Sequence, residues 1–133
     1  MIARFFDRQD TANPLNGVTV PDERTLDEAL DSLRKREPSF CELMGDNGFE
    51  LLIGVGHDIG CVQYSAADGS LPYLIAVASE SANDDGYVEF LTADTPTPIP
   101  VRYCLPLRMI RAIAAEFVIT GERSESVTWE EVS

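Results

Sequence analysis

Residues 40–55 read Phe40-Cys-Glu-Leu-Met-Gly-Asp-Asn-Gly-Phe-Glu-Leu-Leu-Ile-Gly-Val55, and this stretch predicts a β-hairpin. Two apolar runs, 40–44 and 49–55, flank Gly45-Asp-Asn-Gly48, and Asn-Gly tolerates the positive φ angles of a tight hairpin turn. The same alternation of short apolar runs and turn residues continues toward the C-terminus. Strands separated by turns at this spacing indicate an antiparallel meander. Further strands are predicted at 61–64, 73–78 and 87–91, with turns at 56–60, 68–69 and 83–86.

A helical pattern lies on each side of this strand region. Thr25 and Glu28 form a capping box, which predicts a helix that ends before Pro38. A second helix is predicted from about Pro106 to Thr120, with Gly121 as its C-terminal cap.

Three other segments complete the chain. Residues 8–24 form a polar connection, residues 95–100 an edge segment or extended linker with proline at every second position, and residues 126–133 a last short strand. We therefore predict one α+β domain over residues 1–133. It has an antiparallel sheet of about five to six strands with two helices packed on one face.

Charge is the unusual property of this composition. The 133 residues include 10 Lys and Arg against 23 Asp and Glu, a net charge of −13. Direct binding of nucleic acid or of an anionic membrane is disfavoured, because both require a basic surface. We expect a cytoplasmic protein, since no apolar run suits a signal peptide or a membrane span. Three widely spaced cysteines, Cys41, Cys61 and Cys104, are typical of buried thiols in a reducing compartment.

The basic residues are separated along the sequence from many of the acidic residues. Between Glu37 and Val101 there is no Lys or Arg, whereas acidic residues recur throughout that stretch. One interpretation is solubility and protection of exposed sheet edges. The other is an anionic surface that attracts a basic partner, because charge complementarity speeds association.

Three motifs resemble chemical signatures, and each fails on its context. Gly54-Val-Gly-His-Asp-Ile-Gly60 resembles a dinucleotide fingerprint, but a strand follows it instead of a helix, which favours a Gly-rich turn or bulge. Asn83-Asp-Asp-Gly86 resembles a calcium loop but lacks its bidentate glutamate. His57 is the only histidine; Cys61 lies four residues on, but no other Cys or His lies nearby to complete a zinc site. We expect no catalytic residues, no metal site and no cofactor.

The second half of the chain resembles a known family. The helix containing Ala112-Ile-Ala-Ala-Glu-Phe117, followed by Ile119-Thr-Gly121 and Val127-Thr-Trp-Glu130, is similar to the C-terminal signature of the first-numbered immunity protein family of bacterial polymorphic toxin systems. Gly60-Cys-Val-Gln-Tyr64 and the Asp68-Gly69 turn also resemble it. The resemblance extends from about Thr25 to Glu130, and Phe117, Gly121 and Trp129 match positions that look structural in the family.

The resemblance implies a small α+β protein that binds and neutralises a cognate toxin domain. Such toxins are commonly nucleic-acid-acting enzymes such as deaminases, whose basic active-site surface an acidic inhibitor would occlude. We expect a non-enzymatic protein that is a monomer or weak dimer when free. From charge and turn position we predict contacts with the toxin at Asp58, Asp68, Asp84, Asp85, Tyr87, Glu89 and Asp94.

Two other classes of function stay open. A small hydrolase would use Cys41 or Cys61 as nucleophile beside His57, which requires their proximity in space. A secretion chaperone or another interaction module would bind the secretion region of a substrate and not a toxic domain.

Overall fold

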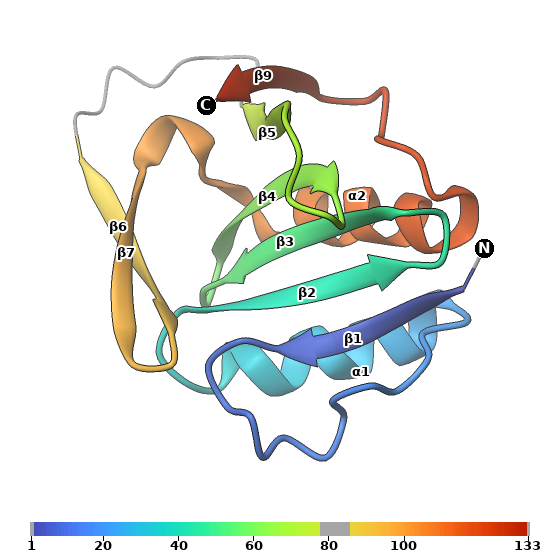
Figure 1. The fold of residues 1–133 in the computed structure, drawn as a ribbon. Helices are drawn as coiled ribbons and strands as arrows, with labels where there is room; N and C mark the ends of the chain where they lie inside the picture. Colours follow the sequence, from blue (N-terminus) through green and yellow to red (C-terminus); the bar gives the residue numbers. More distant parts are fainter. Residues whose placement is uncertain (1, 78–85, 133) are drawn as a thin grey trace.

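The structure, a computed structural model, describes residues 2–77 and 86–132. It has an α+β fold, as predicted, with both helices behind a curled sheet (Figure 1). The elements are β1 (Ala3–Asp7), α1 (Glu23–Arg34), β2 (Ser39–Gly45), β3 (Phe49–Val55), β4 (Ile59–Ala66), β5 (Tyr73–Val77), β6 (Tyr87–Thr92), β7 (Thr95–Pro100), the 3-10 turn η1 (Val101–Tyr103), β8 (Leu105–Pro106), α2 (Leu107–Thr120) and β9 (Thr128–Val132).

The sheet is larger than predicted, and it is mixed. Seven strands follow the order β7-β6-β2-β3-β4-β5-β9, while β1 pairs with β2 and β8 pairs with β4. The predicted meander is confirmed for β2 to β5. It ends there because β9 pairs with the other edge of β5, and β6 instead meets β2 in parallel at Ser39 and Leu91. The prediction of about five to six strands, all antiparallel, is therefore wrong in strand number and at this parallel contact.

Of the two predicted helix caps, the one at the N-terminus of α1 is wrong and the one at the C-terminus of α2 is confirmed. Asp22, not Thr25, is the N-cap of α1, and its carboxylate accepts a hydrogen bond from the Thr25 backbone N–H at 2.9 Å. An aspartate suits this position because it also neutralises the positive end of the helix dipole. Gly121 is confirmed as the cap of α2, with a left-handed φ of 75°.

The main core lies between the sheet and the two helices. Both helices contact β3 and each other, so both pack on the same face of the sheet. The strands contribute alternate side chains to this face, as expected for a sheet with one face buried. The fully buried residues of this core include Leu26, Leu30 and Leu33 of α1, Ile110, Ile113 and Phe117 of α2, and Leu43, Ile53 and Val62 of the strands.

A second, smaller apolar cluster lies on the other face and holds the β6–β7 hairpin. Phe40 and Phe90 pack there with ring centroids 5.4 Å apart, and Cys61 is buried beside them. Gly54 lies within β3, which confirms the strand predicted at 49–55. A Cβ at Gly54 would lie 2.8 Å from the Phe90 ring and 2.6 Å from the Cys61 sulfur. Glycine at this position therefore lets the hairpin close against the sheet.

The proline-rich segment is an edge strand, one of the two predicted alternatives. The Val101 backbone N–H donates to the Gly86 carbonyl at 2.9 Å. Because backbone N–H groups alternate in direction along a strand, those of Thr97 and Ile99 also point toward β6. Pro96, Pro98 and Pro100 then point their nitrogens outward. The outer edge of β7 has no N–H donor at these three positions, which protects it from pairing with another strand.

Within residues 2–77 and 86–132, neither helix combines the length and the apolar character that a membrane span requires.

Candidate protein-binding surfaces

The stretch without Lys or Arg forms β2 to β7, so the segregation of charge in the sequence is also a segregation in space. The arginines that contact its carboxylates come from outside it. Arg8 lies 3.2 Å from Glu42, and Arg34 lies 3.9 Å from Asp58. Because α1 and α2 carry four of the ten bases alongside acidic residues, the helix layer has mixed charge, whereas the strand layer from β2 to β7 is anionic.

Two of the predicted contact residues share the outward face of the β6–β7 hairpin. Tyr87 is 68% exposed, and Glu89 is exposed beside it on β6. Val88 and Phe90 alternate with them and pack into the smaller apolar cluster, which fixes the outward direction of Tyr87 and Glu89. Exposed tyrosines are enriched in protein interfaces, so Tyr87 is the residue of this face best suited to contact a partner.

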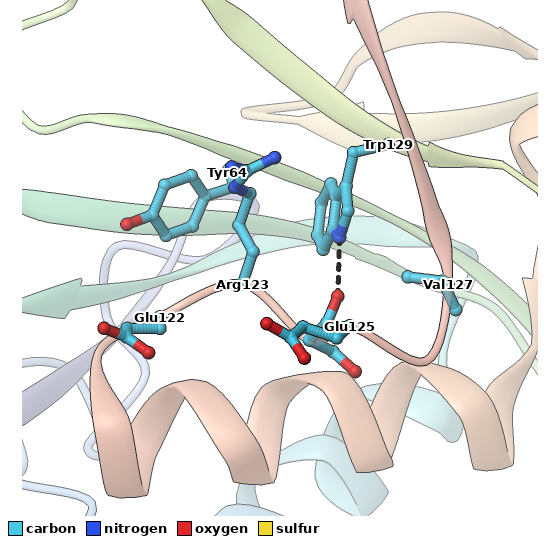
Figure 2. Close-up of a pocket in the computed structure, with 7 residues that line it drawn as sticks. Tyr64, Glu122, Arg123, Glu125, Val127 and Trp129 are labelled. Carbon is cyan, nitrogen blue, oxygen red and sulfur yellow. Dashed lines mark hydrogen bonds between the residues drawn. The ribbon is translucent and has the colours of Figure 1, made fainter.

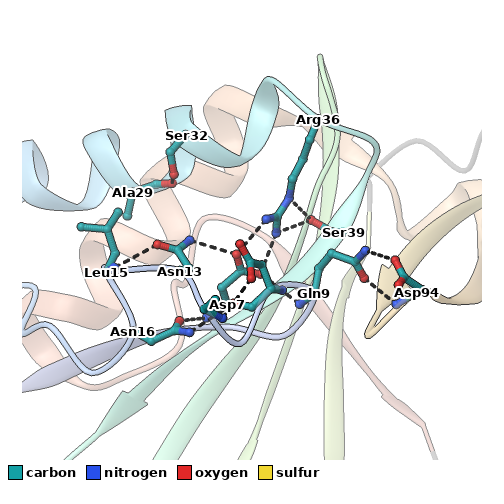
Figure 3. A network of polar contacts seen from close by, with 12 residues as sticks. Asp7, Gln9, Asn13, Leu15, Asn16, Ala29, Ser32, Arg36, Ser39 and Asp94 are labelled. Carbon is teal, nitrogen blue, oxygen red and sulfur yellow. Dashed lines mark hydrogen bonds and ion pairs between the residues drawn. The ribbon is translucent and has the colours of Figure 1, made fainter.

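Asp94 lies at the tip of the same hairpin. Ala93 and Asp94 have φ angles of 48° and 66°, a turn geometry that usually requires Asn or Gly. Contacts with the segment after β1 compensate for this strain, as Figure 3 shows for Asp94. The Gln9 side chain donates to the Asp94 carboxylate at 2.6 Å and accepts from its backbone N–H at 2.7 Å. Asp94 therefore has a structural role in holding the hairpin tip.

The segment that holds the tip is itself fixed by a buried ion pair (Figure 3). The Asp7 carboxylate, which is 0% exposed, accepts two hydrogen bonds from the Arg36 guanidinium, at 2.6 and 2.8 Å. Asn13 donates to it at 2.9 Å, and the backbone N–H groups of Gln9 and Asp10 complete its partners. Burial alone would raise the pKa of Asp7, but these hydrogen bonds outweigh it and lower the pKa below the ordinary value.

Asp58 lies apart from the hairpin, in the turn between β3 and β4. Its side chain is 93% exposed, and its backbone carbonyl accepts the Leu107 N–H at 2.9 Å, which satisfies the first turn of α2. Around it, Arg34, Arg108 and Arg111 line a pocket of about 410 Å³. Asp58 therefore lies among arginines, of which Arg34 and Arg111 also pair with acidic residues of α1.

Asp68 lies beyond the opposite end of β4 from Asp58. Its carboxylate accepts the Ser70 backbone N–H at 2.8 Å, and hydrogen bonds from the Ser70 side chain and backbone lower its pKa. The eight residues of β4 separate the two aspartates, and such a strand is roughly 26 Å long. The structure thus brings Tyr87, Glu89 and Asp94 onto one hairpin but does not bring Asp58 and Asp68 together. Asp84, Asp85 and the predicted turn at 83–86 fall in or beside residues 78–85, outside the described residues.

A pocket of about 500 Å³ opens beneath the connection from α2 to β9 (Figure 2). Tyr64 and Trp129 form its aromatic wall, with ring centroids 6.3 Å apart, and the Arg123 guanidinium lies 5.8 Å from the Tyr64 ring. Trp129 donates its indole N–H to the Ser124 carbonyl at 2.8 Å. Trp129 of the edge strand β9 is partly buried against the main core, which agrees with the structural position that the resemblance implies.

The three thiols do not form an obvious nucleophilic site. Cys41 and Cys61 are buried on opposite faces of the sheet, and burial raises the pKa of both thiols, that of Cys61 to about 12. A thiol with so high a pKa carries almost no thiolate at neutral pH. His57 is exposed in the β3–β4 turn, and its carbonyl accepts a hydrogen bond from Arg34. This arrangement does not favour a Cys–His hydrolase.

Sequence reasoning missed three features. The Asp7–Arg36 pair joins residues 29 positions apart, and the Tyr64–Trp129 wall depends on the pairing of β9 with β5. Neither has a local signal. The third feature is the proximity of Glu42 and Glu50, and it had a local signal. The hairpin centred on Asn47 places Met44 opposite Glu50 and Glu42 opposite Leu52.

Comparison with protein families gives a match over most of the chain. The model of the family described as Immunity protein Imm1 matches residues 16–131. No curated protein matches the chain.

Proposed function

The chain belongs to the Imm1 immunity protein family, and from this premise we propose that it binds a cognate toxin domain and neutralises it by covering the toxin's active-site surface. The match over residues 16–131 is the observation that carries the proposal. Membership of this family points to a non-enzymatic inhibitor, and the buried, poorly ionised thiols agree with that role.

We propose a toxin that acts on nucleic acid, such as a deaminase. An enzyme that binds nucleic acid requires a basic cleft, because phosphate contacts dominate the affinity. The anionic strand layer of this protein, formed by β2 to β7, has the complementary charge. Electrostatic attraction between such surfaces raises the association rate and weakens as salt is added.

The outward face of the β6–β7 hairpin supports this proposal as one contact surface. Tyr87 supplies exposed aromatic area and Glu89 supplies charge, while the proline edge of β7 disfavours association by strand pairing. Contact through side chains is therefore expected, over an interface of about 1,600 Å² in total. Asp58, Asp68, Asp84, Asp85 and Asp94 remain proposed contacts on the basis of charge.

We propose a cytoplasmic site of action, where a producing cell would need protection from its own toxin. Three free cysteines, Cys41, Cys61 and Cys104, are consistent with a reducing compartment.

The test is co-expression with the toxic domain encoded by the neighbouring gene. Rescue of growth together with a one-to-one complex by size exclusion is the expected result. Failure of both would overturn the proposal. Replacement of Asp84 and Asp85 by Lys is expected to slow association and to reduce its salt dependence. An unchanged rate and an unchanged salt dependence would exclude those two residues from the steering surface.

A further inference from the structure

The sheet face that points away from the helices carries a half-buried patch, here named the open-face patch. Residues directly opposite each other on paired strands share a face, and the register places Phe6 opposite Glu42, Glu42 opposite Leu52, and Met44 opposite Glu50. Their neighbours along the strands, such as Leu43 and Leu51, point into the main core. The patch consists of Phe6, Glu42, Met44, Glu50, Leu52 and Gln63, all of them half-buried.

Two carboxylates occupy the centre of this patch with one base beside them. The Glu42 side chain is only 15% exposed, and Arg8 contacts it at 3.2 Å. Burial, followed by the nearby Glu42 carboxylate, raises the pKa of Glu50 to about 7, although Arg8 lowers it in part. Like charges on neighbouring strands destabilise a sheet. In the free protein, Arg8 therefore balances only one of the two acids.

Apolar side chains lie on both sides of the pair. Phe6 and Met44 line a shallow pocket of about 270 Å³ together with Ile2, which is 54% exposed. Arg4 and Asp46 also line this pocket, and the Arg4 guanidinium donates to the Gly17 carbonyl at 3.1 Å. Leu52 lies on the other side, where it packs against the smaller apolar cluster beneath the hairpin. In Figure 1 both helices lie behind the strands that carry the patch, and within the described part of the chain no helix contacts it from the front.

We propose, on the basis of the immunity function above, that the open-face patch is a docking site for a basic surface of the toxin, with an arginine side chain bound between Glu42 and Glu50. Charge complementarity selects this occupant, because two carboxylates with one arginine leave one negative charge to be balanced. A guanidinium fits better than an ammonium, since it is weakly hydrated and its planar fork can bond two carboxylates amid apolar side chains. Phe6 and Met44 would contact the apolar surface around that arginine.

Docking of an arginine at this patch makes the affinity for the toxin depend on the protonation of the Glu42–Glu50 pair. The charged groups that face Glu50 are Glu42 from β2 and Arg8 from the segment after β1, whereas β4 presents Ser65, which does not titrate. Arg4 of β1 lies on the same face opposite Met44, but its guanidinium donates to the Gly17 carbonyl. A bound guanidinium favours the ionised pair, so binding releases the proton that the pair holds in the free protein. Affinity is therefore expected to tighten by about tenfold in total as the pH rises from 6 to 8, for release of one proton with a pKa of about 7, and to change most below pH 7.

The experiment measures binding of a catalytically inactive variant of the neighbouring-gene toxin domain at pH 6, 7 and 8. The variants are Glu50→Gln and the matched control Glu28→Gln, which removes the same charge from the exposed surface of α1. The control is expected to bind like the wild type at each pH. Glu50→Gln is expected to bind at least tenfold more weakly at pH 8 and to lose the extra pH dependence.

A stability measurement separates a binding role from a structural one. Because Glu50→Gln removes a repulsion, the free variant should be as stable as the wild type at pH 8, or more stable. A variant that is less stable, or one that binds the toxin as tightly as the control, overturns the docking site while the immunity function stands. If the wild type itself does not bind the toxin domain, the proposed function fails, and the docking site fails with it.

Discussion

Replacement of Arg36 by Met is expected to destabilise the protein by about 3 kcal/mol at pH 7, because it leaves the Asp7 carboxylate buried without its cation. Arg36 donates two hydrogen bonds to Asp7 and two to the Ser39 hydroxyl. Loss of one partner of a buried pair typically costs about 3–5 kcal/mol. The lower end of this range applies here, since three other donors remain on the carboxylate. Urea denaturation followed by circular dichroism measures the difference.

The difference in stability between the wild type and Arg36→Met is expected to depend on pH. Folding lowers the pKa of Asp7, so the stability that its carboxylate contributes is fully present above the unfolded pKa of about 4. That contribution disappears as the pH falls through the folded pKa. The stability gap between the wild type and Arg36→Met should therefore be largest at neutral pH and should narrow below about pH 4, when Asp7 protonates.

Arg36→Lys is the matched control, because it keeps the charge but cannot reproduce the four hydrogen bonds. An intermediate loss is expected. A loss below about 1 kcal/mol for Arg36→Met, or a gap that stays constant from pH 7 to pH 3, would refute the claim that this ion pair fixes the segment after β1.

Three further changes test other parts of the account. Phe90→Ala is expected to cost about 3–5 kcal/mol, because the ring is fully buried beneath the hairpin, and unchanged amide exchange in β6 and β7 would contradict that role. Cys61 should react with a thiol reagent at pH 8 only as fast as the protein unfolds, since burial raises its pKa to about 12; rapid labelling of the folded protein would revive the hydrolase alternative. Tyr87→Ser should change stability by less than about 0.5 kcal/mol but speed dissociation of the toxin complex about tenfold or more, and an unaltered dissociation rate would remove the hairpin face from the interface.

The parts of the fold that were predicted correctly depend on local signals. Asn47-Gly48 between two apolar runs specifies the β2–β3 hairpin, and Gly121 ends α2 in the left-handed conformation that glycine favours. The position of the α1 cap was wrong because Thr25 and Asp22 both suit a cap. Sequence spacing alone does not rank two such residues.

The parts that were missed depend on contacts between distant segments. β9 pairs with β5, and β6 therefore pairs with β2 instead, where Ser39 lies opposite Leu91 in parallel. No repeat or turn residue in the sequence indicates this strand order. The proposed contact set shows the same limit. Charge and turn position grouped Asp58 with Tyr87, whereas in the structure Asp58 lies among arginines near the start of α2.

The central claim is that this protein inhibits a toxin by stoichiometric binding, and titration of the purified toxin domain's activity tests it most directly. We predict that activity falls linearly and reaches zero near one equivalent of the protein at low salt, and that inhibition at nanomolar concentrations weakens as salt is raised. Full activity in the presence of a large molar excess of the folded protein would contradict the claim.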